Sequence, residues 1–153
     1  MLDLDGTGRI SFIDTKYWTE KDDEGEKLAG KTYKLFTLVD GAYRLRKDRE
    51  LCLAKEFRRG KGEPVIATED LELSENSRYR LTVLNGLSNG RNRCSAAVIK
   101  VGEVTIVHPQ DLNQSKYLFT HDVELSGEGP LSVELRSDVG CSVWVLIDHA
   151  TPN

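Results

Sequence analysis

Four oxygen-bearing side chains near the start of the sequence have the spacing of a calcium-binding loop. They are Asp3, Asp5, Thr7 and Asp14, at positions one, three, five and twelve of a twelve-residue segment. Gly8 falls at position six, where such a loop turns sharply, and Ca²⁺ prefers hard oxygen ligands. Calcium is therefore the candidate ion. The simpler interpretation is a polar turn leading into a strand, because Asp14 is shorter than the bidentate Glu usual at position twelve.

The same segment, Asp3-Leu4-Asp5-Gly6-Thr7, has the form of a phosphoryl-transfer motif. In that chemistry the first aspartate attacks phosphorus and the second handles the leaving-group proton beside Mg²⁺. The pair must end a buried parallel strand within alternating strands and helices. The rest of the chain supplies no such alternation, so we do not predict this activity.

The histidines do not suggest a catalytic or metal site either. His108, His121 and His149 are widely spaced, and none has a second ligand-type residue at metal-binding distance along one element. No nucleophile-elbow sequence is present. We therefore predict no catalytic residues and a protein that is not an enzyme.

Composition narrows the class of protein. The chain has 153 residues and a formal charge of −4, which argues against a nucleic-acid partner because phosphate contacts need a basic surface. It has no apolar run of about 18 residues, so no membrane span is predicted. The sequence as given begins without the basic and apolar regions of a signal peptide. Acidic residues gather at 20–26 and basic residues at 44–61.

Cys52, Cys94 and Cys141 are odd in number and far apart. They lack the short paired spacings of a zinc site and the density of a disulfide scaffold. Each has apolar neighbours, so we expect buried free thiols. A single bridge, Cys94 to Cys141, is the alternative, and it requires that the chain mature outside the cytosol.

Alternating apolar and polar residues predict an all-β fold, an antiparallel β-sandwich of the jelly-roll type with at most one short helix. The helix alternative falls at residues 50–59. We expect one domain over residues 1–153, in which 1–30 could instead form an irregular N-terminal extension. The expected strands are 9–13, 32–38, 42–45, 50–57, 65–67, 71–73, 78–84, 94–101, 104–107, 117–125, 131–135 and 142–147.

Candidate binding residues come from exposed aromatics and from turn-rich loops. Sugar-binding sandwiches use Trp or Tyr faces with a few polar groups for hydroxyls, and binding groups usually lie on loops of a rigid scaffold. Core packing of the aromatics and turn formation by the polar residues are the simpler roles. The candidates are Tyr17, Trp18, Trp144, Arg91, Asn92, Asn113 and Gln114.

The second half of the chain resembles a β-sandwich module that recurs in bacterial cell-surface and secreted proteins. The resemblance covers about residues 77–149 and is carried by 79–86, 90–97, 109–114 and 131–137. Such modules are similar in layout to jelly-roll carbohydrate-binding, galactose-binding-like domains. The resemblance implies an extracellular or cell-surface location and a non-catalytic role, and it supplies no binding residues.

Two functions remain open from the sequence. The first is an accessory module that binds a glycan or a partner surface through its loops. The second is a structural or assembly domain, a spacer or self-associating module, that associates through exposed strand edges. The sequence sets neither the ligand nor the oligomeric state.

Overall fold

The computed structural model describes residues 2–4, 10–21, 23–46, 50–71, 73, 77–125 and 129–150. Within these ranges the chain is all β, with one 3₁₀ turn at Pro109–Asp111 as its helical element. The strands form three antiparallel four-stranded sheets, which we call A, B and C. No described helix has the length and apolar character needed to span a bilayer.

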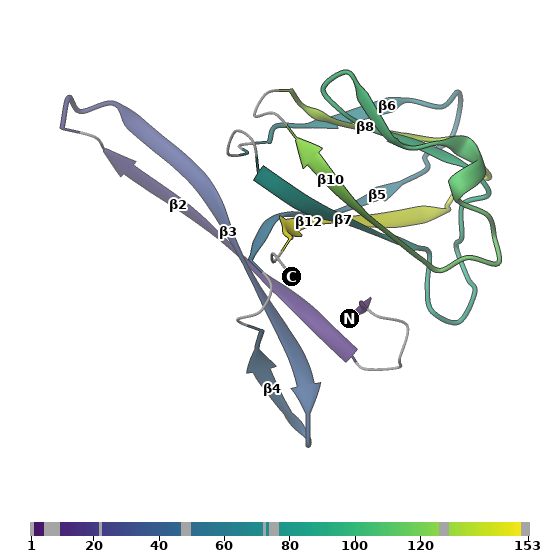
Figure 1. Cartoon of the computed structure of the whole chain (residues 1–153), viewed down its shortest axis with the longest axis horizontal. Helices are drawn as coiled ribbons and strands as arrows, with labels where there is room; N and C mark the ends of the chain where they lie inside the picture. The colour runs from purple at the N-terminus through teal and green to yellow at the C-terminus, as the bar shows by residue number, and fades with distance from the viewer. Residues whose placement is uncertain are drawn as a thin grey trace.

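Sheets B and C form the sandwich (Figure 1). Sheet B has the order β10-β7-β12-β5 and sheet C the order β6-β11-β8-β9. The strands of sheet B are β5 (Leu51–Arg58), β7 (Ser77–Asn85), β10 (Leu118–Leu125) and β12 (Ser142–His149). Those of sheet C are β6 (Ile66–Glu69), β8 (Ala97–Val101), β9 (Val104–Val107) and β11 (Leu131–Leu135).

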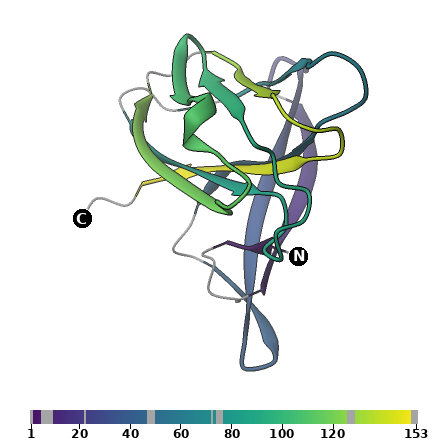
Figure 2. The same ribbon diagram turned by 90° about the vertical axis from the view of Figure 1, so that its right-hand side faces the viewer.

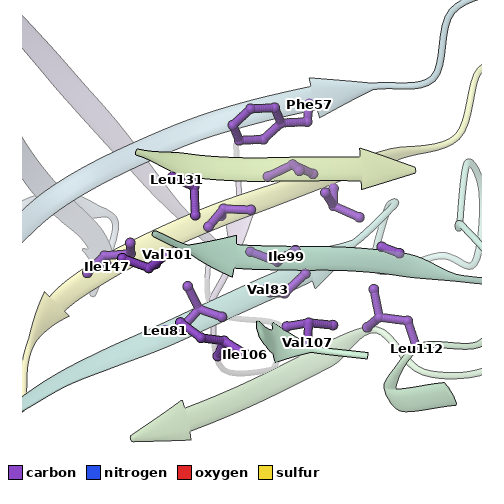
Figure 3. Close-up of a cluster of buried hydrophobic side chains, with 14 of the residues drawn as sticks. Phe57, Leu81, Val83, Ile99, Val101, Ile106, Val107, Leu112, Leu131 and Ile147 are labelled. Atoms are coloured by element: carbon purple, nitrogen blue, oxygen red, sulfur yellow. The ribbon is translucent and has the colours of Figure 1, made fainter. Parts of the chain in front are cut away.

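Alternation along these strands builds the main core (Figure 3). In β12, Val143, Val145 and Ile147 point to the same side and are at most 1% exposed. In β11 of sheet C, Leu131 and Val133 likewise share one side of the strand and are at most 1% exposed. Because successive residues of a strand face opposite sides, this period of two directs one face of each sheet inward.

Sheet A is a long hairpin laid across the outer face of sheet B (Figures 1 and 2). Its order is β1-β2-β3-β4, and its strands are β1 (Leu2–Asp3), β2 (Ile10–Lys21), β3 (Lys27–Val39) and β4 (Ala42–Leu45). A second apolar cluster joins the two sheets, with Ile13, Tyr33 and Leu35 of sheet A against Leu84 and Leu146 of sheet B. Toward the Lys21–Lys27 turn the hairpin extends beyond the sandwich.

The predicted fold class is confirmed as an all-β, sandwich-like fold, and the jelly-roll layout stays a prediction. The alternative of an irregular extension over residues 1–30 is wrong for the described part, since β2 and the start of β3 are regular strands. Residues 51–58 form β5 and not a helix. Leu71 and Leu73 lie outside the strands, and the strand expected to begin at Cys94 begins at Ala97.

Candidate functional site

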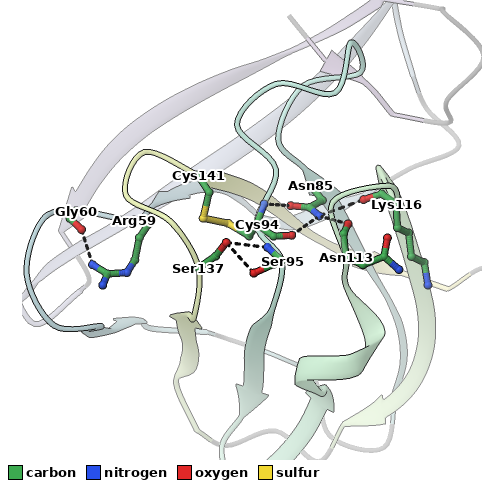
Figure 4. Close-up of a disulfide and its surroundings, with 9 residues drawn as sticks. All are labelled: Arg59, Gly60, Asn85, Cys94, Ser95, Asn113, Lys116, Ser137 and Cys141. Carbon is green, nitrogen blue, oxygen red and sulfur yellow. Dashed lines mark hydrogen bonds between the residues drawn. A yellow bond between two sulfur atoms is a disulfide. The ribbon is translucent and has the colours of Figure 1, made fainter.

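Asn85 is a fully buried amide at the end of β7 that holds two loops in place (Figure 4). Its Oδ1 accepts a hydrogen bond from the Cys94 backbone N–H at 2.7 Å, and its Nδ2 donates to the Cys94 carbonyl at 2.9 Å. Nδ2 also lies 3.0 and 3.1 Å from the carbonyls of Asn113 and Lys116. Because a buried amide is costly unless paired, these contacts fix the loop after β7 against the loop before β10.

The next residue, Gly86, lets the loop after β7 fold back on itself. Its φ is +68°, in the left-handed region that favours glycine. A Cβ at this position would collide with the backbone of Arg91, Asn92 and Arg93. The Gly86 N–H donates to the Ser142 carbonyl at 2.7 Å, which ties the loop to the start of β12.

A disulfide joins this loop to the segment before β12 (Figure 4). Cys94 and Cys141 are bonded, with their Cα atoms 5.1 Å apart, within the usual range for a disulfide. Both residues are buried. The expectation of free thiols is therefore wrong for this pair, because the fold brings together two cysteines that are 47 residues apart in the sequence.

Cys52, in contrast, is a free thiol, as expected. It is half-buried on β5, and burial raises its pKa to about 11, with the nearby Glu50 and Asp148 adding to the shift. At neutral pH the thiol is therefore protonated and a poor nucleophile.

An open cleft of about 410 Å³ lies between the crosslinked loops at this end of the sandwich. Asn92, Gln114 and Asp138 line it and provide amide and carboxyl groups. Val139, whose side chain is 57% exposed, adds an apolar wall. We call this the loop-end cleft. Amides and a carboxylate beside a small apolar surface suit a hydroxyl-rich ligand.

Arg93 also lines the cleft, but its guanidinium holds the loops together. Nη1 donates to the Gln114 carbonyl at 3.2 Å, and Nη2 donates to the carbonyls of Leu87 and Ser88 at 3.4 and 3.3 Å. The guanidinium carbon lies 5.7 Å from the centre of the Tyr117 ring, a cation–π distance. Arg93 therefore supports the cleft more than it offers a free ligand group.

The four polar candidates from the sequence divide into two pairs. Asn92 and Gln114 come together at the loop-end cleft. Asn113 performs turn chemistry, since its Oδ1 accepts hydrogen bonds from the Ser115 N–H and Oγ at 2.9 and 2.6 Å. Arg91 is exposed on the loop after β7, and it is not among the residues that line the cleft.

Trp144 is not an exposed platform. It points to the outer face of sheet B, opposite Val143 and Val145, and there packs against the second apolar cluster beneath sheet A. The sequence placed it correctly on the face away from the core, but it could not show that another sheet covers that face. Its role is packing between the sheets.

Tyr17 and Trp18 lie in the second half of β2, whose end projects beyond the sandwich (Figure 1), and neither lines the loop-end cleft. Tyr17 is 75% exposed, with the Lys31 ammonium 5.6 Å from its ring centre. Trp18 is 42% exposed, and its ring lies over Gly30, its partner on β3, where the Cβ of any other residue would collide with the ring. The structure therefore separates the aromatic candidates from the polar ones.

The calcium candidates are described only in part, because Asp5 and Thr7 lie outside the described residues. Asp3 pairs with Ile10, and Asp14 is four residues further along the same strand, β2. Four residues of extended chain span roughly 13 Å, more than one ion's coordination sphere. Asp3 and Asp14 are thus not brought together, and the described residues hold no group of three or more metal-ligating side chains.

A second open cleft, of about 550 Å³, lies between sheet A and the edge of the sandwich. Glu69 of β6 accepts hydrogen bonds there from Lys55 at 2.5 Å and from Lys31 of β3 at 3.1 Å. The hydrogen bond from Lys55 lowers the pKa of Glu69, burial opposing it, and Glu69 raises the pKa of Lys31. This ion-pair network links the hairpin to the sandwich.

Sequence reasoning missed Asn85, Arg93 and Asp138. The available signal for Asn85 was its position at the end of a predicted buried strand, which is typical of a structural amide. Comparison with known proteins adds no assignment, because no protein-family model, curated protein or solved structure matches this chain.

Proposed function

We propose that this chain is a non-catalytic accessory module that binds a glycan at the loop-end cleft. One observation carries the proposal: three loops converge at one end of the sandwich and are held there by Asn85 and the Cys94–Cys141 disulfide. Loops fixed in this way lose little conformational entropy when a ligand binds. The side chains of Asn92, Gln114 and Asp138 are then available for sugar hydroxyls.

The disulfide also supports an extracytoplasmic origin, since such bonds persist in oxidising compartments. The resemblance of residues 77–149 to cell-surface sandwich modules leads to the same proposal. The proposed mode of recognition differs in one respect from the sequence-based expectation. Recognition here rests on amide and carboxyl groups, because the exposed aromatics lie on the hairpin.

The test is a thermal-shift screen of the purified protein against a panel of oligosaccharides. A ligand that binds only the folded state raises the melting temperature by mass action. We expect a saturable rise with one glycan, lost in Gln114→Ala and Asp138→Ala. Asn92→Gly removes a third polar side chain while keeping the left-handed backbone at φ +58°.

Gln110→Ala is the matched control, because it removes the same amide from an exposed residue that does not line the cleft. It should leave the glycan response unchanged. A flat response of the wild-type protein to the whole panel would overturn the proposal.

A second function, self-association, is favoured by a separate observation. The face of sheet A that points away from the sandwich carries partly exposed aromatic and aliphatic side chains, with no described element packed over them. The two functions use different surfaces and are compatible.

A further inference from the structure

One asparagine of the sequence is followed, two residues later, by a hydroxyl-bearing residue. It is Asn113, in the sequence Asn113-Gln114-Ser115, whose middle residue is not proline. This pattern is the acceptor sequence for N-linked glycosylation in secreted proteins, where it lies on surface loops. Because the pattern is short, the setting of Asn113 in the fold decides whether it can accept a glycan.

Asn113 lies at the surface, in the loop that joins the 3₁₀ turn to β10. Residues 113–116 are all exposed. They form a β-turn, in which the Lys116 N–H donates to the Asn113 carbonyl at 3.1 Å. The same carbonyl accepts a hydrogen bond from the buried Asn85 Nδ2 at 3.0 Å (Figure 4). The backbone of Asn113 is therefore fixed to the sandwich, whereas its side chain is accessible.

The hydrogen bonds of the Asn113 side chain use its oxygen and leave its nitrogen free. Oδ1 accepts from the Ser115 N–H at 2.9 Å and from the Ser115 hydroxyl at 2.6 Å. Because a backbone N–H can only donate, the atom that faces Ser115 must be the oxygen of the amide. Nδ2 has no hydrogen-bond partner within the described part of the chain.

A glycan on Nδ2 is therefore compatible with every described contact of this loop. Glycosylation replaces one hydrogen of Nδ2 and leaves Oδ1 and the backbone carbonyl of Asn113 unchanged. Both hydrogen bonds from Ser115 and the one from Asn85 are retained. Asn113 does not line the loop-end cleft, so the attached sugar also leaves the cleft residues in place.

The disulfide indicates independently that the chain passes through a compartment where such a modification can take place. Cys94 and Cys141 are bonded, and disulfides persist in secretory and extracellular compartments. Secretory compartments are also where an Asn-x-Ser sequence acts as an acceptor. The bond and the acceptor sequence therefore agree on the route that the chain takes.

We propose that Asn113 is an N-glycan acceptor, modified from a lipid diphosphate-linked oligosaccharide during secretion. A bond forms between Nδ2 and the anomeric carbon of the first sugar. The bond from that carbon to the diphosphate oxygen breaks, the lipid diphosphate leaves with the electron pair, and the Nδ2 proton passes to a base of the transferase. The inference rests on the extracytoplasmic origin proposed above, and it does not require the cleft to bind a ligand.

The test is to produce the full chain, fused to a cleavable secretion signal, in eukaryotic cells that carry out N-glycosylation. We expect the secreted protein to carry one glycan, detected as a mass increase that a peptide N-glycosidase removes and located at Asn113 by peptide mapping. Ser115→Ala should abolish the modification, because it removes the hydroxyl that the acceptor sequence requires. Ser115→Thr should retain it.

Two further variants separate the amide nitrogen from the fold of the loop. Asn113→Asp keeps an oxygen for the Ser115 hydrogen bonds and removes the nitrogen, so it should lose the glycan and keep its melting temperature within that of the unglycosylated protein. Asn89→Gln is the matched control. Asn89 is also exposed and accepts a hydrogen bond from the Arg91 N–H, but it has no hydroxyl two residues later, so the glycan should be unchanged.

The outcomes separate this inference from the origin on which it rests. A secreted protein with the Cys94–Cys141 bond formed and Asn113 unmodified would overturn the inference and leave the extracytoplasmic origin standing. A secreted protein with neither the bond nor the glycan would overturn both. A glycan that persists in Asn113→Asp would also overturn the assignment, because another residue would then be the acceptor.

Discussion

Asn85 and Cys94 are joined by two hydrogen bonds between one side chain and one backbone, with the Asn85 Oδ1 accepting from the Cys94 N–H and the Nδ2 donating to its carbonyl. The same Cys94 is bonded through its sulfur to Cys141. Its backbone and its side chain are therefore both fixed. One residue of the loop thereby links β7 to the segment before β12, and the loop-end cleft depends on this link.

Replacing Asn85 with Ala should destabilise the protein by about 3 kcal/mol, because each buried backbone group left without a partner costs about 1–3 kcal/mol. Urea unfolding measures the change. Asn89→Ala is the control, since the exposed Asn89 Oδ1 accepts one hydrogen bond, from the Arg91 N–H, and its loss should cost about 1 kcal/mol or less. Equal effects of the two substitutions would contradict the role assigned to Asn85.

The Cys94–Cys141 disulfide should contribute about 4 kcal/mol, the loop-entropy value for a closed loop of its 47-residue separation. Cys94→Ser with Cys141→Ser should lower the free energy of unfolding by this amount, measured in urea without reductant. Adding reductant should bring the wild-type protein down to the same value and leave the double variant unchanged. A wild-type protein indifferent to reductant, with all three thiols titratable after unfolding, would show that the bond does not form.

Cys52 should react slowly with thiol reagents. Burial raises its pKa from 9.0 to about 11, which lowers the thiolate fraction near pH 8 by about 100-fold. The rate of reaction with iodoacetamide, compared between native protein and protein in urea, measures this. The native rate should still be rising with pH near pH 10. Equal native and unfolded rates at pH 8 would contradict the assigned environment.

The sandwich could be predicted from the sequence because alternation reports burial directly. Val143, Val145 and Ile147 recur every second residue, and the strand that contains them was expected at 142–147 and is found at Ser142–His149. The outer half of β2 gave no such signal. From Lys16 to Lys21 both faces are exposed, so no period of two distinguishes an inner side.

The candidate site was harder to predict, because its contacts join segments distant in the sequence. Asn92 and Gln114 were selected as loop residues, but their meeting at one cleft depends on how the 86–96 and 112–117 segments fold back. The packing of Trp144 also depends on residues distant in the sequence. Its face was inferred correctly, yet the apolar cluster against which it packs includes Leu35, a residue more than 100 positions earlier in the sequence.

The ion-pair network at Glu69 gives a prediction for pH. Hydrogen bonding from Lys55 lowers the pKa of Glu69 below 4.5, so the carboxylate stabilises the fold above that pH and loses this contribution as pH falls through the folded-state pKa. Glu69→Gln should cost about 1 kcal/mol or less at neutral pH, because Lys31 and Lys55 are more than a third exposed and screened.

The difference in unfolding free energy between wild type and Glu69→Gln should therefore shrink as pH is lowered below about 4.5. Urea unfolding at a series of pH values measures it. Amide exchange in β3 around Lys31 should also quicken in the variant, since this network links the hairpin to the sandwich. Glu124→Gln is the control, because its carboxylate is 3.9 Å from Arg78 and 81% exposed. A difference that stays constant down to low pH would show that Glu69 acts through packing and not through its charge.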